Sequence, residues 1–100
     1  MKKSHVPNID DIRTRLRGLL VAQFGPVCAE VPEDAILPEA LGDRYDSLAA
    51  LQCITTVEKE FGFEVDFVTH DVRHAFSRID RIIQFIQERL EDNAVLEARL

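Results

Sequence analysis

Apolar residues recur at three- and four-residue steps in three segments of this 100-residue chain. That spacing is the period of an α-helix with one buried face. It predicts helices over residues 9–24, 47–61 and 77–90. The apolar residues that make up these faces are Ile12, Leu16, Leu19, Leu20 and Phe24; Leu48, Leu51, Cys53, Ile54, Val57 and Phe61; and Ile79, Ile82, Ile83, Phe85, Ile86 and Leu90.

The ends of the three helices carry their own signals. Asn8 can cap the first helix, and Gly25, followed by proline, ends it. Gly62 can close the second helix in a left-handed conformation. Ser77 and Asp80 have the spacing of a capping box at the start of the last helix.

The segments between the helices differ in length. Residues 25–46 hold three prolines and many acids, and we expect an ordered loop with a turn of helix near residues 38–41. Residues 63–68 alternate apolar and polar side chains and predict an extended segment. Thr69 can cap a short helix over residues 70–76. The expected core anchors of the connecting segments are Val27, Val31, Ile36, Leu37, Leu41, Phe63, Val65, Phe67, Val72 and Phe76.

These elements predict an all-α fold, a small four-helix bundle with three long helices and a short third helix. A long ordered loop joins its first two helices. The length allows one domain over residues 1–100. We expect its core to lie within about residues 8–91, with residues 1–7 and 92–100 as tails.

The net charge of −6 is unevenly distributed. Residues 1–29 carry a charge of +3, residues 30–71 carry −9, and residues 72–100 are neutral. An acidic middle argues against nucleic acid as a partner and favours proteins that present Lys and Arg. There is no apolar run long enough to cross a membrane and no secretory signal, so we expect a cytoplasmic protein without membrane insertion.

Neither catalysis nor metal binding is indicated. Cys28 and Cys53 lack metal-ligand spacing and are expected to be free thiols. His70 and His74 would share a helix face, but no third ligand accompanies them, and two solvated polar residues are the better interpretation. No histidine stands in a relation to Ser47 that suggests a catalytic base, so we expect no enzymatic activity from this chain alone.

One stretch resembles the acyl carrier protein family. The second predicted helix opens with Asp46-Ser47-Leu48, and its end and the residues after it read Glu58-Lys59-Glu60-Phe61-Gly62-Phe63-Glu64-Val65. The match to the family runs from Asp46 to Val65 without a gap. The resemblance implies that Ser47 carries a 4′-phosphopantetheine arm, donated by coenzyme A, with cargo held as a thioester. It also implies that Asp46 helps to position the modification site, and that Leu48 is partly exposed and contacts partners beside it.

The same resemblance implies partners. They would be a phosphopantetheinyl transferase and acyl-loading and acyl-using enzymes with basic patches, as in fatty acid or polyketide biosynthesis. The carrier itself is expected to be a monomer. The partner face implied on the second helix comprises Leu48, Gln52, Thr55, Glu58 and Glu60.

The chain departs from the family pattern at several places, among them a segment between Val65 and Ile79 that is about three residues longer and a second-helix face with fewer acids than usual. The family usually has one residue between a glycine and the Asp-Ser-Leu triplet, whereas here three residues, Asp43-Arg44-Tyr45, separate Gly42 from Asp46. Tyr45 is therefore expected to cover or flank Ser47. Phe76 stands where a smaller aliphatic residue is common, which would narrow a cargo pocket. Three alternatives stay open: Asp46 or Ser47 as a helix cap only, a peptidyl or aminoacyl carrier, and an unmodified carrier-like bundle acting as an interaction subunit.

Overall fold

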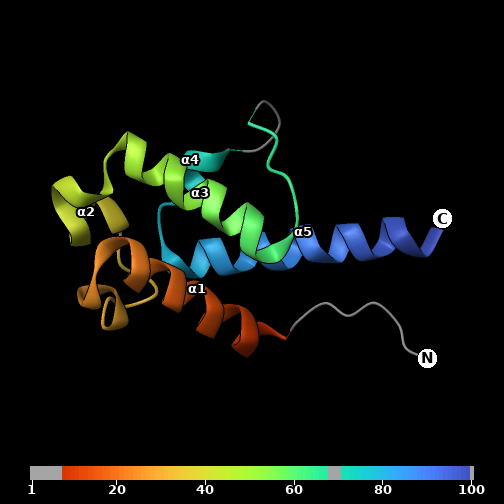
Figure 1. The fold of residues 1–100 in the computed structure, drawn as a ribbon, viewed down its shortest axis with the longest axis horizontal. Coiled ribbons are helices and arrows are strands. Elements are labelled where there is room, and N and C mark those ends of the chain that lie inside the picture. The colour runs from red at the N-terminus through yellow and green to blue at the C-terminus, as the bar shows by residue number, and fades with distance from the viewer. Residues whose placement is uncertain (1–7, 68–70, 100) are drawn as a thin grey trace.

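The computed structural model describes residues 8–67 and 71–99, and most of that length is helical (Figure 1). The long helices are α1 (Ile9–Phe24), α3 (Ser47–Phe61) and α5 (Ile79–Arg99). The short ones are α2 (Leu37–Leu41), α4 (Val72–Ala75) and the 3₁₀ helices η1 (Pro26–Ala29) and η2 (Gly42–Tyr45). These residues form no strand, so the predicted all-α class is confirmed.

Helix α1 begins and ends where its sequence predicts. The Asn8 side chain accepts a hydrogen bond from the Asp11 amide at 2.8 Å. At the other end Gly25 has a positive φ of 101°, which favours glycine, and Pro26 follows it. The residues that α1 buries are Ile12, Leu16, Leu20 and Phe24.

Helix α3 has the predicted bounds but a narrower buried face. Its buried residues are Cys53, Ile54, Val57 and Phe61. Leu48 and Leu51, which the periodicity placed on the same face, are 64% and 46% exposed. The buried residues of α3 begin at Cys53, and both leucines before it are open to solvent.

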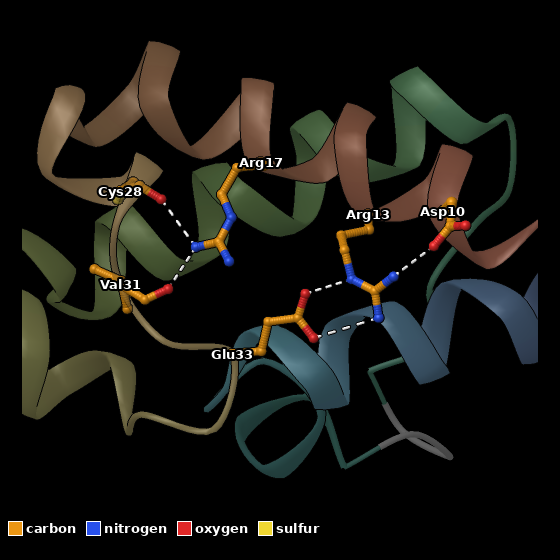
Figure 2. A network of polar contacts seen from close by, with 6 residues as sticks. All are labelled: Asp10, Arg13, Arg17, Cys28, Val31 and Glu33. Atoms are coloured by element: carbon orange, nitrogen blue, oxygen red, sulfur yellow. Dashed lines mark hydrogen bonds and ion pairs between the residues drawn. The ribbon is translucent and has the colours of Figure 1, made fainter.

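The connection between α1 and α3 is ordered and held to α1 by arginines (Figure 2). Arg17 donates to the carbonyl oxygens of Cys28 and Val31 at 3.0 and 2.6 Å. Arg13 pairs with Glu33 at 2.5 Å and with Asp10 at 2.8 Å. Part of the acidic charge of this segment is therefore neutralised inside the molecule.

The anchors of this connection differ partly from those predicted. Val31, Leu37 and Leu41 are buried as expected, whereas Val27 and Ile36 are exposed. Cys28 and Tyr45 are buried in addition. The 3₁₀ turns η1 and η2 rotate these two side chains inward, and neither turn has a periodic pattern long enough to be recognised.

The connection also reaches the start of α5. The Leu37 amide donates to the Ser77 carbonyl at 2.8 Å, and the Asp80 amide donates to the Glu33 carbonyl at 3.0 Å. The Ser77 hydroxyl donates to the His74 carbonyl at 2.7 Å. The predicted capping box is therefore wrong, because Ser77 closes α4 and α5 begins two residues later.

Helix α4 is shorter than predicted. It begins at Val72, and the Asp71 side chain accepts from the His74 amide at 3.2 Å, so Asp71 is its cap. The expected cap, Thr69, and the expected first residue, His70, lie outside the described residues.

Helix α5 forms the centre of the molecule. It packs against α1 and α4, and in Figure 1 it extends beyond the other helices toward the C-terminus. Its buried residues are Ile79, Ile82, Ile83, Phe85 and Ile86. Residues 92–99, expected as part of a tail, continue the helix, because the sequence there contains no glycine or proline to end it.

The extended segment after α3 is only partly docked. Phe63 is buried and Val65 is half-buried, but Phe67 is 52% exposed. Phe63 and Phe76 both pack edge-on against Phe85, with ring centroids 6.1 and 5.6 Å apart. The predicted inward position of Phe67 is therefore wrong, since Phe76 supplies the ring that lies against α5 from this side.

Candidate functional site

Ser47 is the first residue of α3 and is exposed. The Asp46 carboxylate accepts from the Ala49 amide at 2.8 Å, so Asp46 is the helix cap. The Ser47 hydroxyl has no hydrogen-bond partner among the described residues. Capping therefore accounts for Asp46 and leaves the position of Ser47 unexplained.

A cavity of about 400 Å³ opens beside Ser47. Its floor is apolar and consists of buried side chains, while its rim is exposed and holds all its charged groups. The floor residues are Tyr45, Ile54 and Phe76; the half-buried walls are Ala50, Val72 and Ser77; and the rim is formed by Pro38, Asp46, Ser47, Leu51, Phe67 and Arg73.

Tyr45 is part of the cavity floor. Its hydroxyl donates to the Phe76 carbonyl at 2.5 Å, and its ring lies 5.5 Å from that of Phe24. Burial raises the pKa of Tyr45, so the phenol is neutral at physiological pH. The sequence predicted that Tyr45 would cover or flank Ser47. Both residues line the same cavity, and Tyr45 does not cover Ser47, since Ser47 is exposed.

Phe76 limits the depth of the cavity. Its side chain is 2% exposed and lies on Phe85 of α5. A smaller aliphatic residue at this position would leave the cavity open toward Phe85 of α5. The bulk of Phe76 therefore closes the cavity at the floor.

Arg73 and Phe67 lie on the rim and were not predicted as site residues. Arg73 follows the Asp71 cap in a four-residue helix, and Phe67 precedes a segment outside the described residues. Neither has a sequence signal of its own. Tertiary packing brings both side chains to the cavity that Ser47 borders, Arg73 as part of α4.

The predicted partner residues on α3 fall into two groups. Leu48, Gln52 and Thr55 are exposed and form one face of the first three turns. Glu58 and Glu60 are engaged within the molecule. The Glu58 carboxylate accepts from the Val65 amide at 2.6 Å, and Glu60 pairs with Arg15 at 3.0 Å.

Arg15 explains why Glu60 faces α1. Its guanidinium also lies over the Phe61 ring, 4.4 Å from the centroid, and donates to the Glu60 carbonyl at 3.0 Å. These contacts tie the end of α3 to α1. The part of α3 that follows Ser47, from Leu48 to Thr56, contains no charged residue.

A shallow groove lies beside this uncharged part of α3. It has a volume of about 530 Å³ and separates α1 from α3. Leu51 borders both the groove and the cavity beside Ser47. The residues that line the groove are Leu19, Ala22, Gln23, Leu51, Gln52, Thr55 and Thr56.

Apart from this site, the described part of the chain offers little chemistry in its thiols, potential metal ligands or long helices. Cys28 and Cys53 are buried free thiols. Within residues 8–67 and 71–94, no three His, Cys, Asp or Glu side chains lie close enough together to hold a metal ion. None of the helices described is both long and apolar enough to cross a membrane.

Comparisons with family models, with curated proteins and with solved structures found no match. The site therefore has to be interpreted from its own geometry: an exposed hydroxyl without a partner at a helix N-terminus, beside a cavity with an apolar floor and a charged rim.

Proposed function

We propose that this protein is a carrier that holds its cargo as a thioester on a 4′-phosphopantetheine arm attached to Ser47. The bundle would act as an acyl carrier with four principal helices, α1, α3, α4 and α5. It would have no catalytic activity of its own. Its partners would be a phosphopantetheinyl transferase and enzymes that load or use the acyl group.

The observation that carries the proposal is the state of the Ser47 hydroxyl. It is exposed and unpaired among the described residues, while its neighbour Asp46 supplies the cap. A hydroxyl that has to be modified by another enzyme needs this accessibility. The helix does not lose a cap when the hydroxyl is esterified.

The surroundings of Ser47 fit the arm. The first turn of α3 has amide groups without intrahelical partners and a partial positive charge, which favours a phosphodiester at that position. The chemistry would come from the terminal thiol of the arm, which forms the thioester. Ser47 supplies the attachment point, and the cavity beside it supplies apolar surface.

The cavity size favours a small or medium cargo. Its volume of about 400 Å³ lies near the lower end of the roughly 300–1,000 Å³ typical of ligand sites. Tyr45 and Phe76 close it from below and hold each other by a hydrogen bond. A long acyl chain would have to displace one of these rings.

The partner face that fits this geometry is mainly uncharged. Leu48 and Leu51 are exposed beside Ser47, while Glu58 and Glu60 have partners within the molecule. Apart from the cap Asp46, the exposed carboxylates that precede Ser47 most closely in sequence lie on α2 and η2, at Glu39 and Asp43. An enzyme with a basic patch would therefore contact Ser47 from the α2–η2 side.

A second function is favoured by the exposed leucines. Leu48 and Leu51, together with the groove toward Leu19, could bind a partner without any modification of Ser47. The protein would then be an interaction subunit with a carrier-like bundle. Binding that is unchanged by Ser47→Ala and weakened by Leu48→Gln would favour this alternative.

Intact-mass analysis tests the carrier proposal. The purified chain is incubated with coenzyme A and a broad-specificity phosphopantetheinyl transferase, and the mass should rise by one arm. Ser47→Ala should abolish the rise. Ser77→Ala is the matched control, because Ser77 lines the same cavity and its hydroxyl is engaged with the His74 carbonyl. No mass change with several transferases would refute the proposal.

A further inference from the structure

Among the described residues that line the cavity beside Ser47, Arg73 is the one cation, and it lies on the rim. The guanidiniums of the other arginines in residues 8–67 and 71–94 all have hydrogen-bond partners. Those partners are carboxylates for Arg13, Arg15, Arg78 and Arg89, backbone carbonyls for Arg17 and Arg44, and a histidine ring for Arg81. In the same part of the chain Arg73 has no hydrogen bond or ion pair.

The carboxylate on the cavity rim, that of Asp46, does not neutralise the charge of Arg73. Asp46 lies on the same rim, but its side chain accepts from the Ala49 amide, and no ion pair joins it to Arg73 within the described residues. Ser47 and Ser77, the other polar side chains at the cavity apart from Tyr45, are uncharged. Arg73 is consequently a free positive charge above an apolar floor formed by Ile54, Phe76 and Tyr45.

This arrangement selects a ligand with two unlike parts. An apolar chain gains by leaving water for the floor, and an anionic group gains a charge-assisted hydrogen bond at the rim. Arginine suits this task because its planar guanidinium matches carboxylate and phosphate oxygens and keeps its charge at all physiological pH values. A neutral apolar ligand would leave the guanidinium without a partner.

We propose that Arg73 binds the anionic group of an amphipathic ligand whose apolar part lies on Phe76 and Ile54. Two sources share this chemistry. One is the phosphodiester of an arm on Ser47, which rests on the proposed function. The other is the carboxylate of an acyl compound that enters the cavity unattached, which does not require any modification of Ser47.

The first experiment uses the unmodified full chain and two probes of equal chain length, octanoate and octanol, followed by NMR. Octanoate should shift the signals of the Arg73 Nε–H and of the Phe76 and Ile54 side chains. Because Arg73 is exposed, removing its charge by Arg73→Gln should lower the octanoate-to-octanol affinity ratio by up to about fivefold. Arg73→Lys keeps the positive charge and should therefore retain part of the preference for octanoate over octanol.

Lys59→Gln is the matched control. Lys59 is exposed on the last turn of α3 and borders neither the cavity nor the groove, so its loss changes the net charge equally without touching the site. The affinity ratio should not change in this variant. An equal fall in Lys59→Gln and Arg73→Gln would assign the effect to net charge and overturn the proposal.

The second experiment identifies the source. In protein modified at Ser47 and carrying no cargo, the Arg73 Nε–H should shift on modification. A phosphorus resonance that also differs between this protein and its Arg73→Gln variant would assign the phosphodiester. A response to octanoate alone would assign the unattached acyl carboxylate. If Ser47 is never modified and octanoate still requires Arg73, the carrier proposal fails and this inference holds. An Arg73 signal that moves with neither source overturns it.

Discussion

Cys53 and Cys28 show at the residue scale how burial controls reactivity. Desolvation raises the pKa of Cys53 to about 12, with a further rise from nearby Cys28, and burial also raises the pKa of Cys28. A thiol must ionise before it attacks an electrophile. Both thiols should therefore be inert in the folded protein, although the sequence alone presents them as ordinary free cysteines.

Alkylation tests this state. Iodoacetamide at neutral pH should leave the folded protein unlabelled over the time in which denatured protein gains two adducts. Because the folded-state pKa of Cys53 is raised, its contribution to stability is present below about pH 9 and is lost as the pH rises toward 12. Labelling of the folded protein as fast as of the denatured protein would contradict the buried positions.

Asp46 allows capping to be separated from recognition by a transferase. Asp46→Ala removes the acceptor of the Ala49 amide and should cost about 1 kcal/mol of unfolding free energy, measured by urea denaturation. Asp46→Asn keeps an acceptor and should retain most of that stability. If Asp46→Asn nevertheless slows modification of Ser47, the carboxylate acts on the transferase. Equal loss of stability in both variants would argue against capping.

At the scale of the element, the long connection between α1 and α3 depends on Arg17. Arg17→Met removes two charge-assisted hydrogen bonds to backbone carbonyls. The half-exposed side chain suggests a cost of about 1–2 kcal/mol in unfolding free energy, with faster amide exchange over residues 26–36. Thr14→Ala, on the exposed side of α1, should change neither quantity. Unchanged exchange in Arg17→Met would show that apolar anchors alone hold the connection.

The elements differ in how far their sequence determined them. The bounds of α1 and α3 follow from long apolar periods and from glycines with positive φ at their ends. The start of α5 does not follow, because the Ser77 hydroxyl is used by α4 and the Asp80 amide by the Glu33 carbonyl. Both partners are fixed by tertiary contacts, which local sequence patterns do not contain.

The residues of the candidate site also divide into those that the sequence identified and those that only the structure reveals. Ser47, Asp46 and the exposed Leu48 were identified from a short motif, and the structure places all three at the start of α3. Arg73 and Phe67 were missed because they reach the cavity through tertiary packing, which local sequence patterns do not contain. Glu58 was placed on the partner face by the family resemblance; in the structure its carboxylate accepts a hydrogen bond from the Val65 amide of the extended segment.

At the scale of the whole molecule, part of the charge asymmetry of the chain is compensated by ion pairs inside the molecule. Arg13 and Arg15 of the basic N-terminal third pair with Glu33 and Glu60 of the acidic middle. Besides the cap Asp46, the exposed acids that precede Ser47 most closely in sequence are Glu39 on α2 and Asp43 on η2. The approach of a basic partner should therefore be governed by this side of the molecule.

Charge reversal distinguishes the two sides. Glu39→Lys combined with Asp43→Lys should slow association with a transferase and reduce its dependence on salt, because exposed charges steer encounter. Glu60→Lys should mainly lower stability, since it places a second cation beside Arg15. Association slowed by Glu60→Lys alone, at unchanged stability, would contradict this assignment and return the partner face to the end of α3.

The central claim concerns the covalent state of Ser47. Its most direct test is mass analysis of the protein isolated from its own cells, at the level of the intact chain and of the peptide that contains residues 45–51. We expect a fraction that carries one phosphopantetheine, with or without cargo, located by fragmentation on Ser47. A chain found only without the arm, or carrying it at another residue, would contradict the claim.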